Sequence, residues 1–383
     1  MLSRSPIWPK NQSVHFIHNW RCAGTTVNSI LSSNFHERYL KIGHPFNNFG
    51  WPHDYNNHPE PLLTVGQIRR LIKSSQSHSV ILGGHTFLGL ESFLPGPFDI
   101  WMNYRDPLQR LNSGILRFYN KQYATKSGDS HLIDVTQSLE STKLDFSIFV
   151  DRLLSSSLIR ESNGIARRLA ALSLSNNIEI NQNTNVETVD FLLSGYSEKD
   201  LFECALSGLS DVNVLINSLY IQASLICIER IYGLSSPLIN PFSNLLHNPV
   251  TLSGAKKSDT SVIDQCKDIL IKHSQADLKL LPYLHTKFAK QVNFAAIDEK
   301  EIAARNAIHQ DRLFMPKWFT FERFSREDVI RLISESLETL CRKNSSLENE
   351  ILAIFFRWNG LNLDVRHDVN KYLKDKFSRT PFI

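Results

Sequence analysis

The sequence predicts an α/β fold: a mostly parallel central sheet flanked by helices, with a helical extension at the C-terminal end. Over the first 120 residues, short apolar runs alternate with helix-like segments, which is typical of parallel strands joined by helices. Beyond residue 145 the apolar residues follow a largely helical spacing. We therefore expect an α/β domain over residues 1–293 and a helical extension of unassigned role over residues 294–383.

The composition is that of an ordinary globular chain. Hydrophobic residues make up 42% of the 383 residues and charged residues 21%, which is enough for a sizeable core. A formal net charge of +4 with no long run of Lys or Arg disfavours a nucleic-acid partner. The five cysteines form no CxxC pair, and the chain shows neither a secretory leader nor an apolar run of about 18 residues. We expect a cytoplasmic protein without a membrane span, a disulfide framework or a metal; the oligomeric state is left open.

The first expected element is a buried strand over residues 14–18, followed by the loop HNWRCAGTT (His18–Thr26) and a helix over residues 26–33. A strand, a tight loop and a helix start are typical of anion sites, because N–H groups at a helix N-terminus point at the anion. The nucleoside-triphosphatase form GxxxxGK[ST] is absent, since the loop has one glycine, Gly24, and one cation, Arg21. The loop therefore resembles a P-loop in layout and predicts an anion site of another kind.

The next expected elements, over residues 34–85, place a histidine, His85, at the end of a second strand. Residues 34–62 are rich in His, Asn, Pro and aromatic residues without periodicity, which predicts an irregular segment on the ligand side. A helix is expected over residues 64–75, with Thr64 as its N-cap. A short buried strand over residues 79–82 then ends in Gly83-Gly84-His85.

The third strand, over residues 98–104, ends in Arg105-Asp106-Pro107 and continues into a helix over residues 108–119. Asp106 is suited to cap that helix, and Ser113 lies two turns in. Ligands of parallel sheets bind outside the carboxyl ends of the strands. If the three strands are neighbours, their polar ends converge on one crevice.

The remaining elements are expected to be helices, because their apolar residues recur at helical spacing. The segments in the α/β domain are 145–157, 163–174, 198–207, 211–232 and 261–292. In the extension, one apolar face comprises Val329, Ile330, Leu332, Ile333, Leu337 and Leu340, and another comprises Leu347, Ile351, Ile354, Phe355 and Trp358.

Four segments resemble, in order and spacing, those of carbohydrate-type sulfotransferases. The loop His18–Thr26 resembles the family's H-x-P-K-x-A-G-T-[TS] loop, and YRDPLQRLNSG (Tyr104–Gly114) is similar to its R-D-P-x-x-R-x-x-S element. GHTFLGL (Gly84–Leu90), followed by the Pro-rich turn Leu94–Pro97, resembles the family's G-H-x-x-x-G stretch, and NGIARRLA (Asn163–Ala170) resembles its N-x-Q-T-R-x-L-A segment. The resemblance covers roughly residues 12–293.

The resemblance implies a sulfotransferase that moves a sulfuryl group from 3′-phosphoadenosine-5′-phosphosulfate (PAPS) to a hydroxyl of a saccharide or glycosylated metabolite. In the family the loop grips the 5′-phosphosulfate, the first Arg and the Ser of the second element bind the 3′-phosphate, and the His is the general base in some members. Sulfuryl transfer needs positioning, charge neutralisation and a base, so no metal is implied. The donor-binding residues implied are Arg21, Cys22, Ala23, Gly24, Thr25, Thr26, Arg105, Ser113 and Arg167, and the catalytic residues are His85 and Arg21.

The loop departs from the family pattern at two positions: Arg21 stands where the family has Lys, and Trp20 where it has Pro. An arginine keeps the positive charge but does not give up a proton in proteins. An electrostatic role for this cation predicts an active enzyme, whereas a proton-donating role predicts impaired activity. We expect the electrostatic role.

Other interpretations stay open. One is a P-loop-type nucleotide-binding protein such as a kinase, although GK[ST] and a clear Mg²⁺-binding Asp are absent. Another is a non-catalytic binding module descended from a sulfotransferase. For single residues, His85 could be a core histidine, Arg105 could pair with Asp106, and Arg167 could form a structural ion pair. Four histidines with irregular spacing are expected to line an acceptor cleft rather than to bind a metal: His36, His44, His53 and His58.

Overall fold

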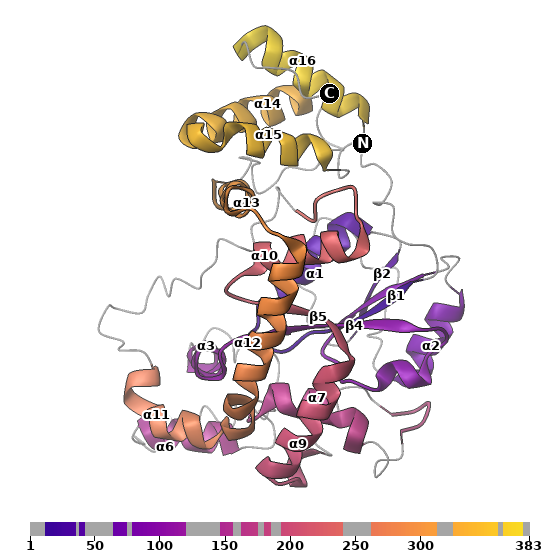
Figure 1. Cartoon of the computed structure of the whole chain (residues 1–383), viewed down its shortest axis with the longest axis vertical. Coiled ribbons are helices and arrows are strands. Elements are labelled where there is room, and N and C mark those ends of the chain that lie inside the picture. The colour runs from indigo at the N-terminus through magenta and orange to yellow at the C-terminus, as the bar shows by residue number, and fades with distance from the viewer. Residues whose placement is uncertain are drawn as a thin grey trace.

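The structure is a computed structural model that describes residues 12–35, 38–42, 64–74, 79–119, 146–155, 162–174, 180–184, 193–239, 262–311, 325–358 and 363–377. Within these residues the centre of the fold is a five-stranded sheet in the order β2-β3-β1-β4-β5, in which all neighbouring strands are parallel. The strands are β1 (Ser13–Ile17), β2 (Tyr39–Ile42), β3 (Ile81–Gly84), β4 (Phe98–Tyr104) and β5 (Val212–Asn217). This sheet and the helices around it confirm the predicted α/β class (Figure 1).

The helices fall into two groups along the chain. Those around the sheet are α1 (Gly24–Phe35), α2 (Val65–Ser74), α3 (Pro107–Tyr119), α6 (Phe146–Ser155), α7 (Gly164–Leu174), α9 (Glu198–Gly208), α10 (Ile221–Tyr232), α11 (Val262–Lys272) and α12 (Gln275–Ala295), with the short 3-10 helices η3 (Leu90–Phe93), η5 (Leu193–Gly195) and η6 (Leu209–Asp211). Those of the C-terminal part are α13 (Glu299–Asp311), α14 (Arg326–Lys343), the 3-10 helix η9 (Ser345–Leu347), α15 (Glu348–Arg357) and α16 (Leu363–Phe377).

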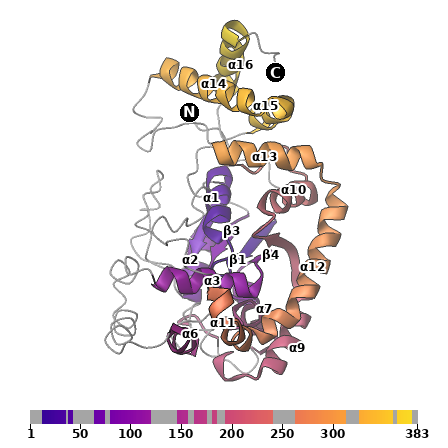
Figure 2. The same ribbon diagram turned by 90° about the vertical axis from the view of Figure 1, so that its left-hand side faces the viewer.

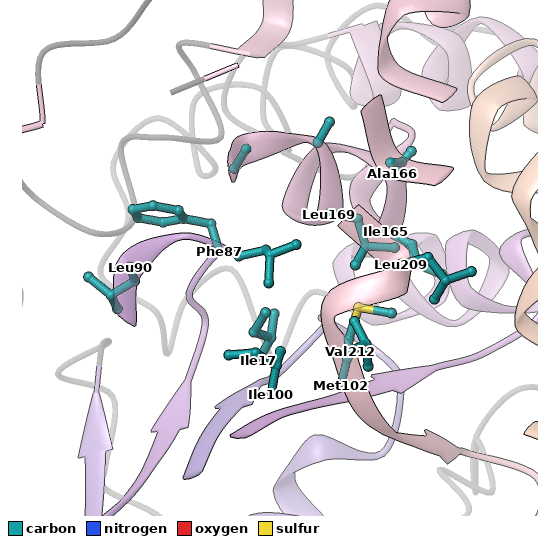
Figure 3. Packing of buried hydrophobic residues seen from close by; sticks show 14 of the residues in the cluster. Ile17, Phe87, Leu90, Ile100, Met102, Ile165, Ala166, Leu169, Leu209 and Val212 are labelled. Atoms are coloured by element: carbon teal, nitrogen blue, oxygen red, sulfur yellow. The ribbon is translucent and has the colours of Figure 1, made fainter. Parts of the chain in front are cut away.

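Helices cover both faces of the sheet. Successive side chains of a strand point to opposite faces, so Val14 and Phe16 of β1 pack in the core formed with α1 and α10. On the opposite face, Ile17 and Met102 belong to the core formed with α2, α7, α9 and α12. In Figure 3 these two side chains point toward the layer that contains Ile165 of α7. The strands are therefore buried on both sides, as parallel strands generally are.

The predicted helix over residues 211–232 is wrong in its first part. Residues 212–217 form strand β5, and only residues 221–232 form a helix, α10. In β5 the residues from Val214 to Asn217 are all buried. A strand buried on both faces has no alternation of apolar and polar residues, so its sequence resembles a buried helix segment.

Two further predictions need correction. The segment 34–62, predicted to be irregular, contains the four-residue strand β2, which lies at the edge of the sheet. The predicted helix over residues 261–292 is two helices, α11 and α12, because the backbone leaves the helical conformation at Ser274, with φ of −135° and ψ of 22°. The four histidines expected to line an acceptor cleft, His36, His44, His53 and His58, lie outside the described residues.

The C-terminal helices α13–α16 lie together at one end of the molecule (Figures 1 and 2). They share a hydrophobic core, to which Ile239 also contributes. Both predicted apolar stripes contribute to it, through Leu337 and Phe355 among others. The predicted boundary at residue 293 falls in the last turn of α12. Several contacts join the C-terminal helices to the α/β part. The Trp358 indole donates to Asn34 Oδ1 at 3.2 Å, at the end of α1, and the buried Arg305 guanidinium donates to both carboxylate oxygens of Glu229 at 2.7 and 2.6 Å. Arg230 of α10 also donates to Glu301 of α13 at 3.2 Å.

Among the helices within the described ranges, none is both long enough and apolar enough to cross a membrane.

Candidate functional site

Three polar strand ends meet at one edge of the sheet. β1 is the central strand, with β3 on one side and β4 on the other. Ile17, the last residue of β1, is in register with Gly84 of β3 and with Met102 of β4. The loop after β1 and His85 after β3 therefore start side by side. β4 continues two residues beyond Met102, to Tyr104, before Arg105 follows at the same edge of the sheet. This is the edge where ligands of parallel sheets bind.

The loop between β1 and α1 has an unusual backbone. Arg21 and Ala23 adopt the left-handed conformation, with φ of 59° and 60°, which residues with a Cβ rarely do. Turns that alternate in this way direct successive N–H groups into an anion-binding concavity, and backbone strain of this kind persists mainly at ligand sites. Cys22, between the two, is fully buried. Gly24, Thr25 and Thr26 open α1, with Thr26 buried.

A buried asparagine of β4 holds this loop in place. The Asn103 side chain is fully buried: its Oδ1 accepts from the Asn19 backbone N–H at 2.6 Å, and its Nδ2 donates to the Cys22 carbonyl at 2.8 Å. The side-chain Nδ2 of Asn19 donates in return to the backbone carbonyl of Asn103 at 2.6 Å. These three bonds span the loop on both sides of Arg21 and fix its conformation.

Sequence reasoning missed Asn103. The signal was present, because Asn103 is a polar residue near the end of the otherwise apolar strand FDIWMNY, and a buried amide needs hydrogen-bond partners.

Arg21 lies against α3. It connects the loop His18–Thr26 with the segment Tyr104–Gly114, the two segments that most resemble the sulfotransferase motifs. Its Nε and Nη2 both donate to Ser113 Oγ, at 3.0 and 2.7 Å. The Trp20 ring packs on Gly114, which follows Ser113 in α3: a Cβ added to Gly114 would lie 2.7 Å from the ring. The Arg21 guanidinium lies 5.8 Å from the centre of the same ring. The two residues that depart from the family pattern thus dock the loop onto α3.

Arg105 is half-buried at the end of β4, and its Nε is buried without a hydrogen-bond partner among the described residues. Asp106 is engaged elsewhere: its Oδ1 accepts from the Gln109 N–H at 2.9 Å and so caps α3, as the sequence predicted. A buried donor without an acceptor is unfavourable. Together with its position at the carboxyl end of β4, this makes Arg105 a candidate to bind an anionic ligand.

His85 follows β3 directly and is half-buried. Its Nδ1 lies 3.0 Å from the His18 carbonyl oxygen. Because a carbonyl only accepts, Nδ1 carries the ring proton and Nε2 is the basic nitrogen.

The turn after His85 is fixed by a buried chain of polar contacts. His15 Nε2 lies 2.7 Å from Thr86 Oγ1 and His15 Nδ1 lies 3.0 Å from Glu91 Oε2. Burial would raise the pKa of Glu91, but the hydrogen bond and charge of His15, with the N–H groups of Glu91 and Gly89, lower it overall. The Arg168 guanidinium donates to the Thr86 carbonyl at 2.5 Å.

Arg167 lies on α7 at a junction with α3 and α12. The buried Arg110 of α3 donates to Asp277 Oδ2 of α12 at 3.2 Å, and Asp277 also accepts from the Ile165 and Ala166 N–H groups that open α7. Burial raises the pKa of Asp277, and the charge of Arg110, followed by the α7 amides and the charge of Arg167, opposes this rise. The structure thus brings Arg167 to a buried ionic junction, in keeping with the ion-pair alternative for this residue.

Comparisons of the chain with models of protein families, with curated proteins and with solved structures gave no match.

Proposed function

We propose that this protein is a sulfotransferase that moves a sulfuryl group from PAPS to a hydroxyl of a saccharide or glycosylated metabolite. The observation that carries the proposal is the loop from His18 to Gly24. It has two left-handed residues, it is held by a buried amide on the neighbouring strand, and it presents its one cation beside α3.

In this proposal, separate groups of residues bind the two phosphates of the donor. In this proposal the loop amides and the charge of Arg21 hold the 5′-phosphosulfate at the N-terminus of α1, and Arg105 and Ser113 hold the 3′-phosphate. Support comes from the buried Arg105 Nε, which has no acceptor among the described residues. The contact between Arg21 and Ser113 is compatible with both roles: Ser113 Oγ accepts both bonds and so keeps its hydroxyl hydrogen for a phosphate oxygen.

In the proposed reaction the acceptor oxygen forms a bond to sulfur while the bond from sulfur to the bridging phosphate oxygen breaks. The acceptor proton moves to His85 Nε2, the basic nitrogen, and the products are the sulfated acceptor and adenosine 3′,5′-bisphosphate. Arg21 offsets the negative charge that develops on the leaving phosphate, and a fixed cation suits that role without releasing a proton.

A second candidate function is a binding module without turnover. The observation that favours it is the engagement of Arg21, whose Nε and Nη2 are both directed at Ser113. A P-loop kinase has no comparable support, because the loop lacks GK[ST].

A screen with radiolabelled sulfuryl donor over acceptor classes, glycans first, tests the proposed function. Transfer of label to a hydroxyl-bearing acceptor supports the enzyme. Binding of the bisphosphate without transfer to any acceptor class supports the binding module, and tighter binding of ATP or ADP than of the bisphosphate contradicts both.

A further inference from the structure

His18 is the first residue after β1, and its ring packs against Gly24 at the other end of the loop. A Cβ added to Gly24, the first residue of α1, would lie 1.8 Å from His18 Cδ2 and 1.9 Å from His18 Nε2. The imidazole therefore occupies the space beside the start of α1 that a side chain at residue 24 would fill. Its Nε2 edge lies at the helix N-terminus, where the anion site is proposed.

The other ring nitrogen of His18 faces the side-chain amide of Asn28. The Asn28 side-chain nitrogen lies 3.4 Å from His18 Nδ1. With the amide nitrogen of Asn28 facing the ring, as in this structure, Nδ1 accepts and the ring proton sits on Nε2. His18 thus presents an N–H at the N-terminus of α1.

The neighbouring imidazole has the opposite arrangement. His85 stacks on His18 with 4.2 Å between ring centres and 24° between ring planes, and its proton is on Nδ1, directed at the His18 carbonyl. The two stacked rings therefore present different groups at the same sheet edge: a basic nitrogen from His85 and an N–H donor from His18.

We infer that His18 is a further ligand-binding residue of this site, whose Nε2–H donates to an oxygen of the 5′-phosphate held at the N-terminus of α1. The inference rests on the proposed function, which supplies the phosphate. In the reaction, charge develops on this phosphate as the bond from sulfur to the bridging oxygen breaks, so a donor placed there assists turnover and product binding alike. It also accounts for Gly24, since any side chain there would displace the ring.

Two variants of the full chain separate this role from packing. His18→Phe keeps a ring for stacking but removes both nitrogens, whereas His18→Gln keeps an N–H donor near the position of Nε2. We expect His18→Phe to weaken binding of adenosine 3′,5′-bisphosphate about 10- to 100-fold and to slow turnover about 10²- to 10³-fold. His18→Gln should recover most of both losses. A matched control, His85→Ala, should slow turnover and leave bisphosphate affinity unchanged. A folded His18→Phe protein that bound the bisphosphate as the wild type does would overturn the inference.

A second measurement needs no variant. In the wild-type chain with ¹⁵N-labelled histidine, NMR should show the Nε2–H tautomer for His18 and a shift of that resonance when the bisphosphate or inorganic pyrophosphate is added. No shift with either ligand would overturn the role of His18. A shift with pyrophosphate, together with no binding of the bisphosphate, would overturn the sulfotransferase proposal while His18 stood as an anion donor.

Discussion

The loop after β1 and the C-terminal helices are held together in opposite ways. The loop from His18 to Gly24 contains two of the four non-glycine residues with left-handed backbone in the described chain, and its clamp is the buried amide of Asn103. The helices α13–α16 instead share an apolar core, and α14 begins with a regular cap in which Ser325 Oγ accepts from the Asp328 N–H at 3.1 Å.

The difference separates a loop with strained backbone from helices that pack without such strain. Left-handed backbone at residues with a Cβ costs stability and persists where the surroundings enforce it, which is typical of ligand sites. An amphipathic helix with a capped start is what stability alone favours. We therefore expect substitutions at the loop to change ligand binding and turnover, and substitutions in α13–α16 to change mainly the free energy of unfolding.

The largest effect is expected at Arg21. Arg21→Ala should abolish turnover, because the only cation of the loop is lost, whereas Arg21→Lys should retain or raise it, because a lysine keeps the charge. Steady-state rates of both variants test this. An alanine variant with wild-type rates would remove Arg21 from the mechanism and weaken the contrast between the two regions.

The next largest effect is expected at His85, which should act on turnover alone. His85→Ala should slow turnover about 10²- to 10⁴-fold, since the acceptor hydroxyl then loses its base, while calorimetry should show unchanged affinity for the bisphosphate. Turnover of the wild type should also fall on the acid side, as imidazoles become protonated. Turnover of the variant within a few-fold of wild type would show that another group is the base.

A pair of core substitutions sharpens the comparison directly. Leu337→Ala, in the fully buried centre of the C-terminal core, should lower the free energy of unfolding by about 2–5 kcal/mol and leave bisphosphate affinity unchanged. Asn103→Leu leaves the Asn19 N–H and the Cys22 carbonyl without their Asn103 partner. It should lower the free energy of unfolding by about 1–3 kcal/mol for each buried group and should weaken bisphosphate affinity as well. Urea unfolding and calorimetry on both proteins provide the test; equal effects on affinity would remove the distinction between the two regions.

A smaller and more selective effect is expected at the proposed 3′-phosphate site. Arg105→Ala and Ser113→Ala should each weaken binding of adenosine 3′,5′-bisphosphate by about 1.5–3 kcal/mol, the range for hydrogen bonds to charged groups. Binding of 5′-AMP, which lacks the 3′-phosphate, serves as the control and should change far less. Equal losses for the two nucleotides would show that this pair does not recognise the 3′-phosphate.

The smallest effect concerns the turn that holds His85. The pKa of Glu91 lies below its ordinary value of 4.5, because the contacts with His15 outweigh burial. The ionised Glu91 therefore stabilises the fold above about pH 4.5, and this contribution is lost as the pH falls through the lower pKa of the folded state. Glu91→Gln should be less stable than wild type at pH 7, and the difference should shrink in acid. Urea titrations at pH 7 and pH 3 measure it; a difference that grew in acid would contradict the assignment.

The sequence predicts the fold class and the amphipathic helices well, because short apolar strands and stripes at helical spacing are local signals. It does not predict β5, since the residues from Val214 to Asn217 are all buried and show no alternation of apolar and polar residues. At the site, the strand order brings together the three predicted strand ends. The contacts of Arg21 with Ser113 and of Asn103 with the loop depend on residues more than 80 positions apart, and no local pattern encodes them.

The central claim is that the loop after β1 holds the 5′-phosphate of a nucleotide whose 3′-phosphate is also recognised. Calorimetric titration of the wild-type chain with adenosine 3′,5′-bisphosphate, ATP and ADP tests it most directly. The account predicts that the bisphosphate binds more tightly than either of the other two, because only it carries a phosphate for Arg105 and Ser113. Tighter binding of ATP or ADP, or no binding of the bisphosphate, would contradict it.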